Sequence, residues 1–163
     1  NLPLLEYPYL FYKIILYYHQ VLVVKFFFFY ILCGIAAALA QALISPFSNI
    51  PMIGASGAVS GILSAYLLLF PRAKVSTLVF IFFFITVIRI PAGFLILIWI
   101  GTQLINANLT DPNSPGVAWF AHIGGFCMGA LLIPFFKKKN FKFFSSGHKH
   151  IKKKKHIRLR FRK

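Results

Sequence analysis

The residues with the clearest chemical potential are Ser56 and His122. Ser56 lies within the run Gly54-Ala55-Ser56-Gly57-Ala58-Val59-Ser60-Gly61, which follows a turn-rich stretch and opens a long apolar segment. Two interpretations of this serine compete. Small residues four apart let membrane helices pack closely. A serine at a helix N-terminus can also act as a nucleophile, because free N–H groups there stabilise a developing oxyanion. This stretch alone favours packing.

Few other side chains could join Ser56 in catalysis. The chain contains only two acidic residues, Glu6 and Asp111, and neither lies within a clear apolar span. A paired-carboxylate mechanism and a carboxylate-rich metal site are therefore excluded, and a Ser-His-Asp triad lacks an evident third member. Cys33 and Cys127 both fall in apolar segments and indicate neither a disulfide framework nor a metal site. We expect no metal and no cofactor.

His122 is the only histidine within a clear apolar span. An ionisable residue inside a membrane span is a functional hypothesis by default. His122 follows Gly116, the expected start of its helix, by six residues. That spacing places it about 9 Å below the outer end of the helix. Ser56 lies in the first turn of its own helix. Both helices are expected to start on the same side of the membrane, so the two side chains can meet at a similar shallow depth.

Two pairs of glycines support this meeting. Gly57 and Gly61 form one Gly-xxx-Gly ledge beside the serine, and Gly125 and Gly129 form a second on the face of the histidine. We expect the ledges to face each other and to bring the histidine within hydrogen-bonding reach of the serine. The alternative is a structural histidine and a serine that only packs. The coincidence of both ledges, both polar groups and a matched depth favours a catalytic Ser-His dyad.

The elements that must position this dyad are membrane spans. The chain has 163 residues, enough for one domain, and is 59% hydrophobic with a mean hydropathy of +0.77. We therefore predict an all-α polytopic membrane protein with about four complete transmembrane helices and a partial N-terminal one. The predicted spans are 22–44, 54–70, 91–107 and 116–136. Residues 1–21 are interpreted as the partial or degenerate helix, and the apolar stretch 75–88 as a short re-entrant or interfacial piece. The start at Asn1 rather than Met indicates an N-terminal truncation.

The basic residues predict an orientation. The net charge is +16, but thirteen of the 18 Lys and Arg residues lie at or beyond Lys137. By the positive-inside rule, the ends marked by Arg72, Lys74 and Lys137 are cytoplasmic, and the loops 45–53 and 108–115 lie on the opposite side. Residues 137–163 are predicted to form a disordered, basic cytoplasmic tail that contacts anionic lipids. We do not expect a nucleic-acid partner.

The serine motif and the histidine motif together match the pattern of a known protein family. The run Gly54-Ala55-Ser56-Gly57 with Gly61, followed by Ala121-His122-Ile123-Gly124-Gly125 with Gly129, resembles the rhomboid intramembrane serine proteases. The resemblance covers roughly residues 24–136, and further stretches are typical of bacterial members. These stretches are Tyr30–Gly34, Pro51–Ile53, Tyr66–Ala73 and the region around Arg89.

The resemblance implies a fold and a reaction. The family has a six-helix core with the serine on the fourth helix and the histidine on the sixth, so residues 22–136 would supply helices three to six and residues 1–21 part of the second. Ser56 would attack a peptide bond in or near a transmembrane segment of another protein, with His122 as the proton carrier. The backbone at Ser56 and Gly54 would stabilise the oxyanion. The expected location is a bacterial inner membrane, with transmembrane proteins as substrates.

The sequence also departs from the family's pattern. The second helix of rhomboids normally supplies a His-xxx-Asn pair near the oxyanion, and no such pair occurs here. Some members carry a tyrosine four residues after the nucleophile, where this chain has Ser60. The alternative function is therefore a catalytically impaired rhomboid-like protein that binds transmembrane helices without cleaving them. A transporter or channel is disfavoured, because the spans contain few ionisable groups and no inverted repeat.

Overall fold

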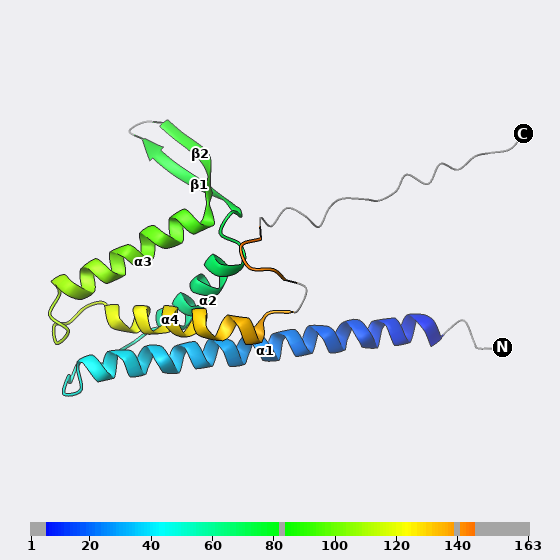
Figure 1. The fold of residues 1–163 in the computed structure, drawn as a ribbon, viewed down its shortest axis with the longest axis horizontal. Coiled ribbons are helices and arrows are strands. Elements are labelled where there is room, and N and C mark those ends of the chain that lie inside the picture. The colour runs from blue at the N-terminus through cyan, green and yellow to red at the C-terminus, as the bar shows by residue number, and fades with distance from the viewer. Residues whose placement is uncertain (1–5, 82–83, 139–140, 146–163) are drawn as a thin grey trace, which may run out of the picture.

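Four helices and one β-hairpin make up the described part of the protein (Figure 1). The computed structural model describes residues 6–81, 84–138 and 141–145, and the side chains of 21–79, 85–138 and 141–145. In chain order the elements are α1 (Glu6–Ile44), α2 (Ser56–Leu69), β1 (Lys74–Ile81), β2 (Phe84–Pro91), α3 (Ala92–Leu109) and α4 (Trp119–Phe136).

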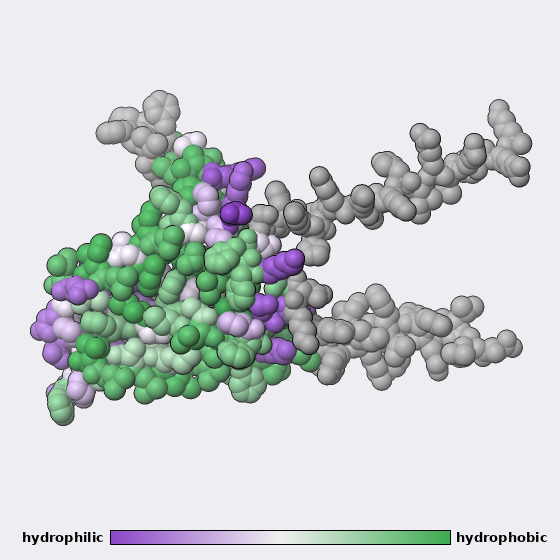
Figure 2. Space-filling view, in the orientation of Figure 1, coloured by the Kyte–Doolittle hydropathy of each residue, from purple (hydrophilic) through white to green (hydrophobic). Residues whose placement is uncertain are grey.

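Three of these helices are long and apolar enough to cross a bilayer. They are the Val21–Ile44 part of α1, all of α3 and all of α4. The shorter α2, with 14 residues, is about 21 Å long and lies among them. Apolar side chains cover the flanks of the bundle, and hydrophilic ones gather at its two ends (Figure 2). The chain is therefore a multi-pass integral membrane protein, and the predicted helical membrane bundle is confirmed.

The interior of the bundle is built from small side chains. Cys33 and Ser60 are fully buried, and Ala37 and Ala58 are buried beside them. Large side chains such as Phe27 on α1 point outward and are exposed. This arrangement suits a lipid solvent, because burying a large apolar side chain gains little there, whereas small residues let helix backbones approach.

The closest approach is between α2 and α4. A Cβ atom added at Gly125 would overlap the carbonyl oxygen of Gly57, and one added at Gly129 would overlap the carbonyl oxygen of Gly61. The structure thus brings the two expected glycine pairs together. On its other side α2 packs against α1, where a Cβ at Gly61 would lie 2.5 Å from the sulfur of Cys33.

The stretch 75–88, expected as a re-entrant or interfacial piece, instead forms most of an antiparallel hairpin. β1 pairs with β2 in a register that runs from Lys74 opposite Pro91 to Ile81 opposite Phe84. The stretch is rich in Val, Ile and Thr, and such β-branched residues favour strands. At the base of the hairpin, the N–H groups of Ala92 and Gly93 donate to the carbonyls of Ala73 and Pro71.

Two helix boundaries differ from those expected and bear on the site. α2 begins at Ser56 rather than at residue 54, because Gly54 has a φ of +122° and lies outside the helix. α4 begins at Trp119 rather than at residue 116, because Gly116 has a φ of +149°. Both glycines adopt the left-handed region of φ, which L-residues with side chains rarely occupy. Each helix therefore starts closer to its candidate catalytic residue than predicted.

The two ends of the bundle also differ in detail from the predicted layout. α1 is continuous from Glu6 to Ile44, so the predicted boundary at residue 21 falls inside one helix. In the predicted tail, the N–H groups of Phe144 and Ser145 donate to the carbonyls of Leu68 and Leu69 at the end of α2. Residues 141–145 therefore lie against the bundle (Figure 1). Residues 139–140 and 146–163 of that tail lie outside the described residues.

Candidate active site

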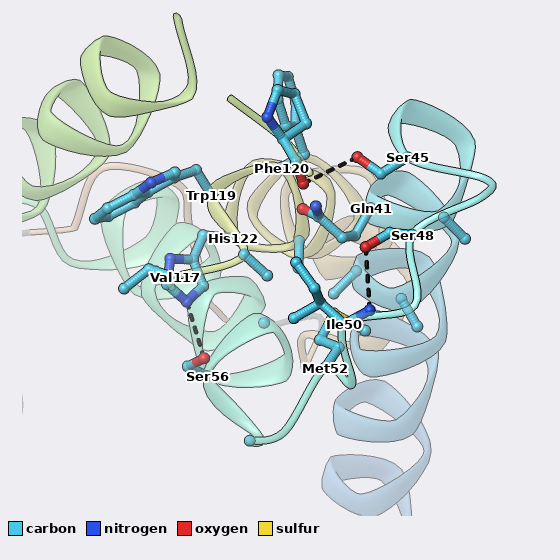
Figure 3. Close-up of a pocket in the computed structure, with 18 of the residues that line it drawn as sticks. Gln41, Ser45, Ser48, Ile50, Met52, Ser56, Val117, Trp119, Phe120 and His122 are labelled. Atoms are coloured by element: carbon cyan, nitrogen blue, oxygen red, sulfur yellow. Dashed lines mark hydrogen bonds between the residues drawn. The ribbon is translucent and has the colours of Figure 1, made fainter. Parts of the chain in front are cut away.

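Ser56 and His122 lie side by side near one end of the bundle (Figure 3). The Oγ atom of Ser56 is 2.8 Å from Nε2 of His122, which is hydrogen-bonding distance. Ser56 is the first residue of α2, and His122 lies only one turn into α4. The histidine is therefore about 4.5 Å from the start of its helix rather than about 9 Å, and the depths of the two residues match closely.

The N-terminus of α2 offers unused hydrogen-bond donors beside the serine. The first N–H groups of an α-helix have no acceptor within the helix, and the N-cap residue Ala55 makes no side-chain cap. The positive end of the helix dipole lies at the same place. A Cβ added at Gly54 would lie 3.9 Å from Oγ of Ser56, so the glycine leaves the approach to the serine open. This end of α2 can therefore stabilise negative charge that develops next to the hydroxyl.

Ser60 connects the backbone of α4 to α2 just below the dyad. Its hydroxyl oxygen lies 2.6 Å from the carbonyl oxygen of Gly57 and 2.8 Å from that of His122. The side chain is fully buried. The hydrogen bond from this hydroxyl to the carbonyl of His122 fixes the position of the histidine along the axis of α2. Ser60 thus helps to set the distance between the two reactive groups.

Gln103 on α3 completes the surroundings of the imidazole, and sequence reasoning missed it. Its Oε1 atom lies 2.7 Å from Nδ1 of His122, and its side chain is 4% exposed. Its side chain is a neutral amide, so it is not among the ionisable residues that identify a candidate site in a membrane span. The available signal was a polar side chain within an otherwise apolar span, because such a side chain faces the bundle interior and hydrogen-bonds to another helix.

The dyad lines a cavity of about 490 Å³ at the end of the bundle that carries the loops 45–55 and 110–118. Gln41 near the end of α1 and Ser45 directly after that helix face this cavity across from the dyad (Figure 3). The hydroxyl of Ser45 donates to the carbonyl of Pro112 over 3.2 Å and joins the two loops. Polar groups from α1 and both loops line the cavity, so water can occupy the space next to the serine.

The site carries little charge. Asp111 is the one acidic residue whose side chain is described, and it accepts a hydrogen bond from the N–H of Asn113 within its own loop. Among the described residues, no three side chains of His, Cys, Asp or Glu are grouped so that they could hold a metal ion. The chemistry of the described site therefore depends on the serine, the imidazole and the neutral hydrogen-bonding groups around them.

The Rhomboid domain family matches residues 10–139 of the chain, which include all four helices except the first residues of α1. The chain belongs to the rhomboid family. No curated protein and no solved structure matches it significantly. The family is one of intramembrane serine proteases, and the match spans both the serine and the histidine of this rhomboid.

This rhomboid surrounds its histidine with aromatic rings from two helices. The ring of Trp99 on α3 lies 5.7 Å from the imidazole between centroids, and that of Trp119 on α4 lies 6.3 Å away. Ser60 occupies the position at which some members carry a tyrosine. The aromatic contacts come instead from α3 and α4, and the small residue at position 60 leaves room for the hydrogen bond to the carbonyl of His122.

Proposed function

We propose that this rhomboid is an intramembrane serine endopeptidase that acts through a Ser56–His122 dyad. The observation that carries the proposal is the 2.8 Å contact between Oγ of Ser56 and Nε2 of His122 at the N-terminus of a helix. A nucleophile within hydrogen-bonding reach of a base is the signature of nucleophilic catalysis. The polar cavity next to the contact supports hydrolysis, because the reaction consumes water.

In the proposed reaction, Oγ of Ser56 attacks the carbonyl carbon of the scissile peptide bond while Nε2 of His122 takes the hydroxyl proton. The C–N bond then breaks, and the same proton passes to the departing amine. Water next attacks the acyl-enzyme, the imidazole takes a proton from it, and the C–O bond to Ser56 breaks. The second half releases the carboxylic acid product and restores the hydroxyl.

We assign the oxyanion site to the backbone of Ser56, with the backbone at Gly54 beside it. The free N–H of Ser56 and the positive end of α2 support this assignment. Removal of a single oxyanion donor typically lowers the rate by about 10²- to 10³-fold. The backbone geometry that places this N–H is therefore expected to matter as much to the reaction rate as the side chains do.

The substrates we propose are transmembrane segments of other proteins in the same bilayer, since the dyad lies near the ends of membrane-spanning helices. We further propose that α1 to α4, within residues 22–136, represent helices three to six of the rhomboid core. Arg72, Lys74 and Lys137 follow the C-terminal ends of α2 and α4, opposite the cavity. The positive-inside rule then favours a cytoplasmic tail, whose basic residues suit contact with anionic lipids. The bacterial inner membrane that we propose as its location rests on the resemblance to bacterial rhomboids.

The proposal is tested by reconstituting the protein in liposomes with a single-span substrate and identifying the products by mass spectrometry. We expect cleavage by the wild type and none by Ser56→Ala. The matched control is Ser76→Ala on the hairpin, where the serine is exposed and remote from the cavity, and this variant should cleave at the wild-type rate. Equal cleavage by Ser56→Ala and the wild type would refute the proposal. Co-purification of the substrate with an inactive wild type would favour the non-cleaving binder.

A further inference from the structure

A continuous chain of hydrogen bonds runs from α3 through the imidazole to the serine. The amide nitrogen Nε2 of Gln103 lies 3.0 Å from the carbonyl oxygen of Trp99 and 3.0 Å from Oγ1 of Thr102. The amide oxygen of Gln103 lies 2.7 Å from Nδ1 of His122, and Nε2 of His122 lies 2.8 Å from Oγ of Ser56. Every contact in this chain is short enough to be a hydrogen bond.

The partners of the amide determine which way it faces. The carbonyl of Trp99 can only accept, so it requires the NH₂ group of Gln103 on its side. The hydroxyl of Thr102 donates to the same carbonyl over 2.6 Å, which leaves its oxygen free to accept from the second amide hydrogen. Both N–H bonds of the amide are thereby used within α3. The oxygen of Gln103 is left to face the imidazole.

The direction of the amide in turn determines the tautomer of the histidine. An amide oxygen carries no hydrogen, so a hydrogen bond at 2.7 Å requires Nδ1 of His122 to carry one. In the neutral imidazole, Nε2 then has a free lone pair that points at the hydroxyl of Ser56. This is the form that a general base needs, because Nε2 must accept the serine proton.

We propose that Gln103 is a positioning residue, which holds the imidazole of His122 in the tautomer and the orientation that can accept the proton of Ser56. The inference rests on the proposed function and gives the dyad a neutral third member supplied by α3. The side chains around the imidazole from α2, α3 and α4 include Ser56, Gln103, Trp99 and Trp119, and none of these four is charged. An amide is suited to this place, because a carboxylate buried at this depth would carry an unpaired charge.

The experiment measures the rate of labelling by a fluorophosphonate probe as a function of pH in the folded, detergent-solubilised chain. We expect Gln103→Leu to lower the rate by about 10- to 100-fold, a part of the 10²- to 10⁴-fold that general-base catalysis supplies. Gln103→Glu keeps an acceptor oxygen and adds a negative charge that favours the protonated imidazole. Its labelling should recover at high pH, with the half-maximal rate displaced upward by about one pH unit or more.

The matched control is Asn106→Leu, which removes an amide one turn further along α3. Within the described part of the chain, the side chain of Asn106 hydrogen-bonds only to the carbonyl of Thr102 in its own helix, so this variant should label at the wild-type rate with the wild-type pH profile. A structural role for Gln103 would reduce the yield or thermal stability of Gln103→Leu but leave the pH profile of the folded fraction unchanged. An unchanged rate and profile for Gln103→Leu, with Ser56→Ala unlabelled, would overturn the inference and leave the proposed function standing.

A second measurement does not depend on activity. The ¹⁵N NMR spectrum of histidine-labelled protein reports which ring nitrogen carries the hydrogen, and the signals of His122 are assigned by their loss in His122→Gln. We expect the neutral ring of the wild type to carry its hydrogen on Nδ1, and Gln103→Leu to lose that preference. A hydrogen on Nε2 in the wild type would overturn the inference even if the protein proved to be an active protease.

Discussion

The packing of α4 against α2 predicts a specific effect of adding one methyl group. In Gly125→Ala, the new Cβ would overlap the carbonyl oxygen of Gly57 and lie 2.6 Å from Oγ of Ser60. Overpacking of this kind destabilises a protein by about 1–3 kcal/mol. We expect the upper end of that range, about 3 kcal/mol, because the obstacle at Gly57 is a backbone atom that cannot move aside easily. Alanine, in turn, stabilises the helix itself by about 1 kcal/mol relative to glycine, which offsets part of this loss. We therefore expect the variant to be less stable than the wild type by about 2 kcal/mol.

The same substitution should impair the dyad. Gly125 lies one turn after His122 on the same face of α4, so relief of the overlap moves the histidine away from α2. A displacement of about 1 Å would take the 2.8 Å contact with Ser56 beyond hydrogen-bonding distance, and misplacements of that size can cost about 10²-fold in rate.

Two assays check this prediction. Thermal unfolding in detergent measures the loss of stability, and fluorophosphonate labelling of the folded fraction measures the loss of rate. The matched control is Gly101→Ala on α3, where an added Cβ would have no neighbour within 4 Å, and we expect it to label like the wild type with unchanged or higher stability. Wild-type stability and rate in Gly125→Ala would refute the close packing of α2 and α4 on which the site depends.

Two further predictions concern the backbone of α4 and the orientation of the chain. Ser60→Ala should lower the free energy of unfolding by about 0.5–1.5 kcal/mol, because it removes the hydrogen bond to the carbonyl of His122. Thermal unfolding measures this change, and a stability equal to that of the wild type would contradict the role of Ser60. An alkaline phosphatase reporter fused after Lys138 should be inactive, and one inserted at Asn113 should be active, because this reporter enzyme matures only outside the cytoplasm. The reverse pattern of activity would contradict the predicted orientation.

Much of the bundle could be predicted because its determinants are local. Apolar runs of about 20 residues identify membrane spans by length and composition alone. The glycine pairs could be matched across α2 and α4 because a Gly-xxx-Gly spacing lies on one helix face. The exact starts of α2 and α4 were less accessible, since they depend on the backbone conformations of Gly54 and Gly116.

The hairpin was not predicted for a physical reason. The length and hydrophobicity of the stretch 75–88 do not distinguish a buried helix segment from a strand. Its enrichment in β-branched residues was the usable signal, as in Thr86-Val87-Ile88 of β2. Pairing between β1 and β2 supplies the backbone hydrogen bonds that the stretch would otherwise obtain from a helix.

Gln103 was not predicted because its role depends on tertiary arrangement. It is separated from His122 by 19 residues and lies on a different helix, so no helical periodicity connects the two. Only the placement of α3 beside α4 brings its amide to the imidazole. Its one local signal is that it is a polar side chain within an apolar span, a feature that it shares with neutral residues as well as ionisable ones.

The identity of the nucleophile is tested most directly by locating the fluorophosphonate adduct. The wild-type protein is labelled in detergent, digested and analysed by tandem mass spectrometry, with His122→Ala treated in parallel. We predict an adduct on Ser56 in the wild type and almost none in His122→Ala, because the serine is activated by the imidazole 2.8 Å away. The absence of an adduct on Ser56 in the folded wild type, or equal modification of Ser56 in both proteins, would contradict the dyad.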